Sequence, residues 1–178
     1  MPLTLLVGGA GAGKSRLAAS LAADRGGPVV VIATAEARDQ EMAERIRRHR
    51  AARPADWTTV EEPVDLEGAL ASAPEDAVAL VDCLTLWVSN LLERGLADED
   101  VLDRAARAAA LAASRSAGTI AVTNEVGSGV VPTNALARRY RDLLGRVNVL
   151  WAEAADQAAL VVAGRIVPLS RPEAMDRG

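Results

Sequence analysis

The stretch that most constrains the fold is "GGAGAGKS", residues 8–15, which directly follows an apolar run at 3–7. The next residues, "RLAASLAA", have the composition of a helix. Glycines let the backbone curl so that its N–H groups point inward at an anion, and the N-terminus of the following helix directs its dipole at the same anion. The stretch satisfies the phosphate-loop pattern G-x-x-x-x-G-K-[ST] through Gly8, Gly13, Lys14 and Ser15.

Two side chains of this loop have expected roles in nucleotide binding. The Lys14 ammonium can reach the β- and γ-phosphates, and the Ser15 hydroxyl can ligate Mg²⁺. The alternative is a glycine-alanine turn with an incidental lysine. The residues expected to contact the nucleotide are Gly8, Gly9, Ala10, Gly11, Ala12, Gly13, Lys14 and Ser15.

Short apolar runs alternate with longer helical stretches along the rest of the chain. The runs are apolar throughout, which is typical of parallel strands covered by helices on both faces. We therefore expect residues 1–178 to form one α/β domain around a doubly wound, mainly parallel sheet in three layers, with a loose polar end from "SRPEAMDR" onward. Strands are expected at 3–7, 29–33, 78–81, 119–123 and 160–163, and helices at 14–24, 38–51, 84–94, 99–116 and 133–155.

Composition narrows the classes of function. Among 178 residues there is no Phe, and the formal net charge is −4, so we expect no nucleic-acid partner. The single cysteine, Cys83, excludes an internal disulfide and agrees with a reducing compartment. No uncharged apolar run reaches the roughly 18 residues needed to span a membrane. These features predict a cytoplasmic protein without a membrane span.

A carboxylate follows the third apolar run, in "AVALVDCLT". Asp82 lies where the carboxyl end of a strand would face the ligand crevice. Phosphate loops are often complemented by such a carboxylate on the metal side, so we expect Asp82 and Ser15 to hold Mg²⁺. The alternative is that Asp82 caps the following helix, and the two roles are compatible. The neighbouring Cys83 is expected to be a small buried hydrophobe.

The only histidine of the chain lies in an arginine-rich segment, "ERIRRHRAARP" at 44–54. On a helix, Met42, Ile46 and His49 form one stripe, which favours a histidine packed in the core. The nearby guanidinium groups favour a neutral imidazole, which can act as a nucleophile or base, and they can stabilise charge on a phosphate. Spacing alone leaves both interpretations open.

Two downstream segments are less specific. The glycine-rich "TNEVGSGVVP", 123–132, either shapes a substrate crevice or is a plain strand-to-helix turn, and Glu125 within it is a candidate base. The helical stripe around "ARRYRDLLGRVN", 137–148, is expected to pack in the core or between subunits; its members are Leu136, Tyr140, Leu143, Leu144 and Val147.

These stretches together resemble the bifunctional adenosylcobinamide kinase/adenosylcobinamide-phosphate guanylyltransferase family of cobalamin biosynthesis. The phosphate loop is generic, whereas the pairing of H-R-A-A-R-P-x-x-W with T-N-E-V-G-x-G-x-V-P is specific. The resemblance covers most of the chain in order. The matching stretches are "GGAGAGKS", "VIATAEARDQEMAERIRRHRAARPADWTTVEEP", "TNEVGSGVVPTNALARRYRDLLGRVN" and "AADQAALVVAGRIVPL".

The resemblance implies two successive activities: phosphorylation of the aminopropanol hydroxyl of adenosylcobinamide by ATP or GTP, then transfer of GMP from GTP onto that phosphate with release of pyrophosphate. The second activity passes through a guanylylated histidine, and the matching position is His49. The resemblance also implies a RecA-like P-loop fold and a homotrimer with sites near the subunit interfaces. Besides the loop, the positions matching nucleotide contacts are Ala33, Thr34, Ala35, Arg50, Ala51, Ala52, Arg53, Glu61 and Asp82, the last of which is often Glu in the family.

Two other functions share the phosphate loop. One is a small-molecule kinase with a structural His49, and the other is a nucleotide-dependent switch protein. Covalent labelling by GTP distinguishes the first alternative, and turnover of cobinamide distinguishes the second.

Overall fold

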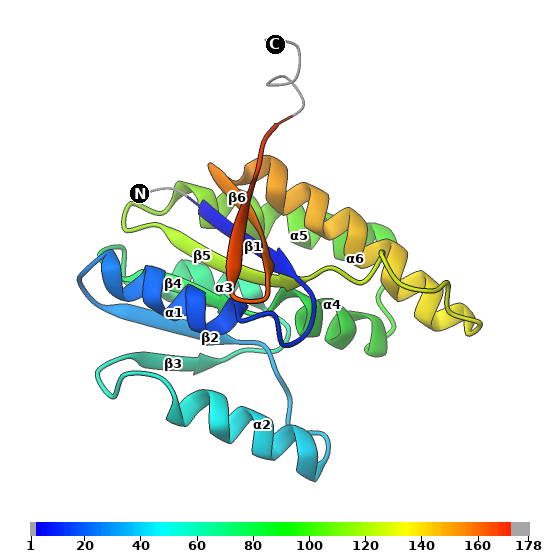
Figure 1. Cartoon of the computed structure of the whole chain (residues 1–178), viewed down its shortest axis with the longest axis horizontal. Helices are drawn as coiled ribbons and strands as arrows, with labels where there is room; N and C mark the ends of the chain where they lie inside the picture. The colour runs from blue at the N-terminus through cyan, green and yellow to red at the C-terminus, as the bar shows by residue number, and fades with distance from the viewer. Residues whose placement is uncertain (1–2, 172–178) are drawn as a thin grey trace.

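A seven-stranded sheet forms the centre of the protein in a computed structural model that describes residues 3–171 (Figure 1). Its strand order is β3-β2-β4-β5-β1-β6-β7, and every neighbouring pair is parallel except the antiparallel pair β6-β7. The predicted doubly wound, mainly parallel sheet is therefore confirmed. The strands are β1 Leu3–Gly8, β2 Val29–Ala33, β3 Thr58–Glu61, β4 Val78–Asp82, β5 Thr119–Asn124, β6 Gln157–Val162 and β7 Arg165–Leu169.

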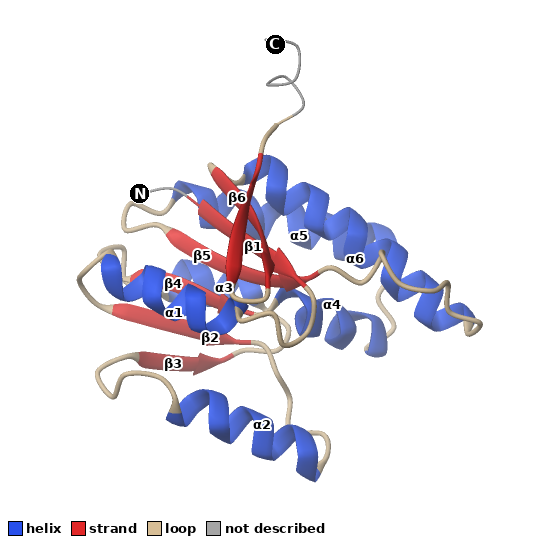
Figure 2. Cartoon of the chain, in the orientation of Figure 1, coloured by secondary structure: helices blue, strands red, loops and turns tan. Residues whose placement is uncertain are grey.

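The helices complete a three-layer architecture (Figure 2). Helix α1 covers one face of the sheet, and α3, α4, α5 and α6 cover the other. Helix α2 instead lies beyond the edge strand β3 (Figure 1). The helices are α1 Lys14–Asp24, α2 Gln40–Ala51, α3 Leu66–Ser72, α4 Leu84–Glu93, α5 Asp98–Ser114 and α6 Ala135–Ala154. Within residues 3–171, no helix is both long enough and apolar enough to cross a membrane.

The central strands are buried on both faces, as their continuous apolar sequences predict. On one face, small residues such as Ala18 and Ala22 of α1 let the helix approach the sheet closely, and both are 0% exposed. On the other face the core includes Trp87 of α4 and Trp151 of α6, the latter beside the buried part of the stripe predicted in 137–148. That stripe is therefore mainly a core feature, but its first member, Leu136, is exposed, so the prediction is wrong at that position.

All five predicted strands and all five predicted helices are present, and apart from the start of β6 their ends differ from the structure by at most two residues. Three elements were missed, for physical reasons. Strand β3 is a mostly exposed edge strand, α3 has only seven residues, and β7 is an exposed edge strand that contains Pro168. Most of the predicted loose end, from "SRPEAMDR" onward, lies outside the described residues.

Candidate active site

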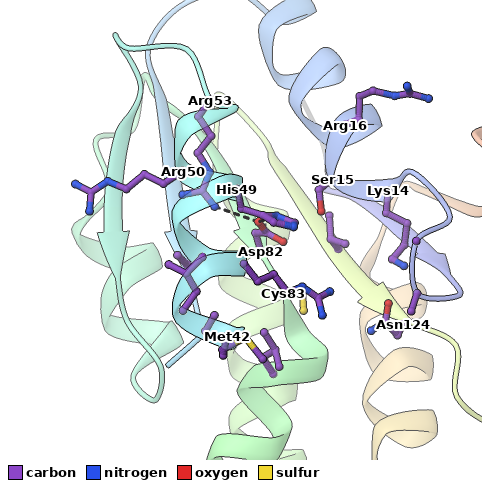
Figure 3. A pocket seen from close by; sticks show the side chains of 18 of the residues that line it. Lys14, Ser15, Arg16, Met42, His49, Arg50, Arg53, Asp82, Cys83 and Asn124 are labelled. Atoms are coloured by element: carbon purple, nitrogen blue, oxygen red, sulfur yellow. Dashed lines mark hydrogen bonds and ion pairs between the residues drawn. The ribbon is translucent and has the colours of Figure 1, made fainter. Parts of the chain in front are cut away.

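A pocket of about 290 Å³ opens at the carboxyl ends of the parallel strands, between the phosphate loop and α2. This is the edge of an open α/β sheet at which ligands commonly bind. Figure 3 shows the side chains of Lys14 and Ser15 on one side of the pocket and those of His49, Arg50 and Arg53, which come from the α2 region, on the other. Sequence segments far apart along the chain therefore meet in one cavity.

The phosphate loop has the backbone geometry that its glycines predict. Gly11 and Gly13 have φ angles of +71° and +97°, which only glycine adopts without strain. Gly8 is needed for a different reason: a Cβ atom there would lie 2.3 Å from the carbonyl oxygen of Val161 in the adjacent strand β6. The loop from Ala10 to Ser15 lines the pocket, whereas Gly8, which ends β1, and the following Gly9 lie outside the pocket lining.

Lys14 is buried at the start of α1. Its ammonium donates hydrogen bonds to the carbonyl oxygens of Gly8 and Gly9, at 2.8 and 2.6 Å. Burial is the main reason that the pKa of Lys14 lies below its ordinary value. The side chain is thus folded against the loop that it would serve in phosphate binding.

Asp82 ends β4 and points into the pocket. Its place is fixed by Thr34, whose N–H donates to the Asp82 carbonyl at 3.0 Å and whose hydroxyl hydrogen-bonds to both the N–H and the carbonyl of Cys83. Thr34 itself is fully buried behind the pocket wall, whereas its neighbours Ala33 and Ala35 line the pocket. The N-cap residue of α4 is Cys83, so the alternative of Asp82 as the helix cap is wrong.

The Asp82 carboxylate has two cationic or polar neighbours from the α2 region. Arg53 Nη2 lies 3.1 Å from Asp82 Oδ2, and His49 Nδ1 lies 3.8 Å from the same oxygen, the latter a close electrostatic contact rather than a hydrogen bond. Burial alone would raise the pKa of Asp82, but His49 and the charge on Arg53 outweigh burial and hold the pKa below its usual value. Asp82 is therefore an anion at neutral pH.

Helix α2 carries the histidine on the stripe that the sequence predicts. The Asp39 side chain caps the helix by accepting a hydrogen bond from the N–H of Met42 at 2.7 Å. Met42, Ile46 and His49 all face the pocket, but none of the described residues 40–51 of α2 is buried. The His49 side chain is 40% exposed, so its interpretation as a core histidine is wrong. The stripe faces a cavity because α2 packs beside the sheet edge and not on a sheet face.

The arginines of this segment divide into two groups. Arg45, Arg50 and Arg53 line the pocket. Arg50 Nη1 also lies 3.3 Å from Oε1 of Glu61, another lining residue. Arg47 and Arg48 instead pair with Glu44 on the exposed side of the helix, as expected for a solvated surface. Ala51 and Ala52, which the resemblance places among the nucleotide contacts, lie at the exposed end of α2 and outside the pocket lining.

The thiol of Cys83 also reaches the pocket. Burial raises the pKa of this thiol, and the charge on Asp82 raises it further. Cys83 is therefore a neutral thiol at ordinary pH, packed against the core residues under α1. This agrees with the expectation of a small hydrophobe, although the residue as a whole is only half-buried.

The segment 123–132 shapes the pocket through its first residues only. Asn124 lines the pocket, whereas Glu125 lines a separate cavity against α6 and accepts hydrogen bonds from the N–H groups of Gly127 and Ser128. The rest is an exposed turn, and α6 begins at Ala135 with Asn134 as its N-cap. Most of the segment is thus a strand-to-helix turn, and of its residues only Asn124 lines the pocket.

Several pocket residues were missed by sequence reasoning. Asn124 could have been found, because it lies at the carboxyl end of a predicted strand, as Asp82 does. Thr59 belongs to the missed strand β3. Arg45 lies in the arginine-rich segment 44–54, but the sequence did not distinguish it from the arginines on the exposed side. The missed lining residues are Arg16, Arg45, Thr59, Leu86, Val122 and Asn124.

The glycine loop between β1 and α1, with an aspartate ending β4 on the far side of β5, defines a P-loop nucleotide-binding α/β protein. Solved structures share this fold. A chain described as a prototypical ATPase from the type III secretion system of pathogenic bacteria has a TM-score of 0.51 at 14% identity over 98% of this chain, which spans about half (53%) of that ATPase chain. The Pyrococcus horikoshii OT3 protein studied as PH0250 has a TM-score of 0.52 at 12% identity, covering 97% of this chain and 88% of that one.

Sequence comparison narrows this class to one family. The family model described as cobinamide kinase / cobinamide phosphate guanyltransferase matches residues 4–169. The bifunctional adenosylcobalamin biosynthesis protein CobP of Pseudomonas aeruginosa is 47% identical over 93% of this chain and 95% of its own length. The corresponding protein CobU of Salmonella typhimurium is 43% identical over 91% of this chain and 96% of its own. The chain belongs to the cobinamide kinase/cobinamide phosphate guanyltransferase family of enzymes.

Proposed function

We propose that this protein phosphorylates adenosylcobinamide with ATP or GTP and then transfers GMP from GTP onto the new phosphate through a guanylylated His49. The observation that carries the proposal is that the phosphate loop and His49 line one pocket. A triphosphate seated on the loop would therefore have a ring nitrogen within the same cavity. A purely structural role for the histidine would not require its side chain to line the proposed nucleotide pocket.

In the kinase step, the hydroxyl oxygen of adenosylcobinamide forms a bond to the γ-phosphorus. The bond from that phosphorus to the bridging oxygen breaks, the nucleoside diphosphate leaves with the electron pair, and the hydroxyl proton passes to water. Lys14 and the inward-pointing N–H groups of the loop neutralise charge on the β- and γ-phosphates. Lys14 can do so by exchanging its present carbonyl partners, Gly8 and Gly9, for phosphate oxygens.

In the guanylylation step, a ring nitrogen of His49 forms a bond to the α-phosphorus of GTP, and pyrophosphate leaves. Because Nδ1 is the nitrogen that faces Asp82, we propose that Nε2 is the attacking atom. A phosphate oxygen of adenosylcobinamide phosphate then attacks the same phosphorus, the P–N bond breaks, and adenosylcobinamide-GDP forms with regeneration of His49. Dividing the transfer in two spares the protein from aligning two polyanions at once.

Two side chains are suited to hold Mg²⁺ with the phosphates. The Ser15 hydroxyl and the Asp82 carboxylate both line the pocket, and the contacts of Asp82 with Arg53 and His49 are made by Oδ2. No cluster of three or more acidic, histidine or cysteine ligands occurs in residues 3–171. Two oxygen ligands suit Mg²⁺, which keeps waters and substrate phosphates as its other ligands. When bound, the ion would neutralise charge on the phosphates.

The remaining proposed nucleotide contacts surround the same cavity. Arg50 and Arg53 provide guanidinium groups for phosphate oxygens, and Asp82 fixes Arg53 in place. Ala33, Ala35 and Glu61 line the part of the pocket nearest β2 and β3, where the nucleoside would lie. We keep Thr34, Ala51 and Ala52 as contacts on the basis of the family resemblance.

We further propose that the chain acts as one domain that assembles into a homotrimer. The β6-β7 hairpin supports assembly, because Val162, Ile166, Val167 and Leu169 are apolar side chains between 46% and 52% exposed. Sedimentation equilibrium of the intact protein tests this proposal, and a monomer at all concentrations would contradict it.

The function is tested by incubating the protein with GTP labelled in the α-phosphate. The wild type should acquire acid-labile label, and His49→Ala should acquire none while it retains adenosylcobinamide phosphorylation. Arg48→Ala is a matched control from the exposed side of the same helix, and it should label like the wild type. Label on His49→Ala would refute the assignment of His49 as the guanylylated residue. Turnover of GTP without any cobinamide product would favour a nucleotide-dependent switch protein.

A further inference from the structure

We infer that Asn124 is a catalytic residue of the phosphoryl-transfer step, whose side-chain amide donates a hydrogen bond to the transferred phosphoryl group. The inference rests on the proposed function of the pocket. It adds a residue that serves phosphoryl transfer but not guanylylation. It is carried by the place of Asn124 in the sheet, by the contacts that fix its backbone, and by the direction of its side chain.

Asn124 ends β5, which lies between β1, the strand that leads into the phosphate loop, and β4, the strand that ends at the proposed Mg²⁺ ligand Asp82. It pairs with Gly8 of β1, the first residue of the phosphate loop, and its strand β5 is flanked on the other side by β4, which ends at Asp82. Alternation along β5 places Asn124 on the same sheet face as Ile120 and Val122, the face that α1 covers. Figure 3 shows Asn124 at the pocket on the side of Lys14 and Ser15.

The backbone of Asn124 is held on both of its polar groups by side chains. Because β4 ends at Asp82, which pairs with Val122, no β4 residue is in register to receive the N–H of Asn124. The Thr85 hydroxyl accepts that N–H at 2.7 Å, and Asn148 Nδ2 donates to the Asn124 carbonyl at 3.0 Å. Two helices, α4 and α6, thus fix the end of this strand.

The residues that hold Asn124 are themselves fixed. The Thr123 hydroxyl donates to Asn148 Oδ1 at 2.7 Å, and the Tyr140 hydroxyl donates to the Thr85 carbonyl at 3.1 Å. Thr85 and Thr123 are buried, where unpaired hydroxyls would be costly. A satisfied network of this kind makes local structure rigid. Here its effect is to fix one strand end and therefore the direction of one side chain.

The side chain of Asn124 is the exception in this network. Within residues 3–171, no group hydrogen-bonds to its amide, and the residue is half-buried in the wall of the pocket. A rigidly placed polar group without a protein partner is suited to a ligand. The amide is neutral and offers two N–H donors, so it can bind a phosphoryl oxygen without repelling it.

This position matches one of the two proposed reactions. In phosphoryl transfer the acceptor oxygen bonds to the terminal phosphorus, the bridging bond breaks, its electron pair leaves with the nucleoside diphosphate, and the hydroxyl proton passes to water. Charge on the terminal phosphoryl oxygens is then stabilised by Asn124, beside Lys14. Guanylylation takes place at the α-phosphorus and at His49 across the pocket, so Asn124 is dispensable for it.

The two activities provide an internal control for the experiment. Asn124→Ala should lower kcat for adenosylcobinamide phosphorylation about a hundredfold, with KM for ATP changed less than about threefold. The rate of His49 labelling at saturating GTP should stay within about twofold of the wild type. Asn124→Asp, which keeps the shape of the side chain, should lower kcat at least as much because it places a carboxylate against the phosphate. Gln157→Ala, which removes an exposed amide at the start of β6, should leave both activities unchanged.

Each outcome decides the inference. It is overturned if Asn124→Ala and Asn124→Asp keep wild-type phosphorylation, or if phosphorylation and His49 labelling fall in parallel. A melting temperature equal to that of the wild type shows that a variant is folded. If Asn124→Ala is not folded, the activities of Asn124→Asp decide the test. Wild-type protein without phosphorylation or labelling would instead show that the proposed function itself is wrong.

Discussion

The phosphate loop and α2 form opposite walls of one pocket, but they are attached to the protein in different ways. The loop follows β1, all six of whose residues are buried, and leads into α1, whose residues Lys14, Ala18 and Ala22 are buried. Helix α2 lies beside an edge strand, and none of its residues, 40–51, is buried. The wall formed by the phosphate loop is continuous with the hydrophobic core, whereas the wall formed by α2 contributes no buried residue to it.

Polar contacts attach α2 to the rest of the protein. In the loop before the helix, Glu36 pairs with Arg94 at 2.6 Å, and Arg38 donates to Asn90 Oδ1 at 2.7 Å. Asn90 in turn donates to the carbonyl of Thr34 at 2.7 Å. These contacts join the beginning of α2 to the end of α4 without apolar burial.

The difference teaches how one pocket can serve two transfers. In the proposed mechanism a rigid loop would fix the polyphosphate in both reactions. In the proposed mechanism the histidine would meet first GTP and then an acceptor phosphate. A helix without buried side chains can shift between two such positions at little energetic cost. We therefore expect α2 to exchange its amide hydrogens faster than α1. Substitutions in the two walls should differ in the same sense.

The largest effect is expected at Lys14. Lys14→Ala removes the buried cation that the loop holds, and both activities depend on the loop, so kcat/KM for each should fall on the order of a thousandfold. Steady-state phosphorylation and the rate of covalent labelling measure the two losses. Arg146→Ala, an exposed cation on α6, should change neither. A Lys14→Ala protein that still labels at the wild-type rate would show that GTP reaches His49 without the loop.

The next largest effect is on the free energy of unfolding, and it concerns the phosphate-loop wall of the pocket. Gly8→Ala places a Cβ 2.3 Å from the Val161 carbonyl oxygen, so β6 must move. We expect a loss of about 3 kcal/mol in the free energy of unfolding, or a fall in Tm of about 10 °C. Gly9→Ala is the matched control, since a Cβ there meets nothing within 4 Å. Equal melting temperatures for Gly8→Ala and the wild type would contradict the close packing of β1 and β6.

The smallest effect is expected at the attachment of α2. Arg94 and Arg38 lower the pKa of Glu36 from 4.5 to about 2, so the pairing stabilises the fold above the ordinary pKa and is lost as the pH falls toward 2. Because these side chains are partly exposed, Glu36→Gln should cost only about 1 kcal/mol near neutral pH. Urea unfolding of both proteins should show the difference shrinking in acid. Glu153→Gln, an exposed control, should show no difference, and a pH-independent difference for Glu36→Gln would contradict the ion pairing.

The same contrast explains what the sequence could predict. The central strands, the phosphate loop and α1 follow from local patterns, because continuous apolar runs and the glycine motif report burial and backbone geometry directly. The stripe of α2 was also predicted, but its partner was not. A helical stripe looks the same whether it faces a core or a cavity, and only the place of α2 beside β3 decides that His49 faces the pocket.

The other omissions have related causes. Strand β3 escaped prediction because an exposed edge strand has no apolar alternation to detect, and Thr59 was missed with it. The contact between His49 and Asp82 joins residues far apart in the sequence, so no spacing rule could find it. The network that fixes Asn124 likewise joins β5 to α4 and α6 through side chains that appear ordinary in the sequence.

The most direct test of the account is peptide mapping by mass spectrometry after incubation with GTP and Mg²⁺, followed by a chase with adenosylcobinamide phosphate. The account predicts one GMP group on the peptide that contains His49, the only histidine of the chain, and its transfer to the acceptor in equal amount. A GMP group on any other residue, or formation of adenosylcobinamide-GDP by protein that never carries GMP, would contradict it.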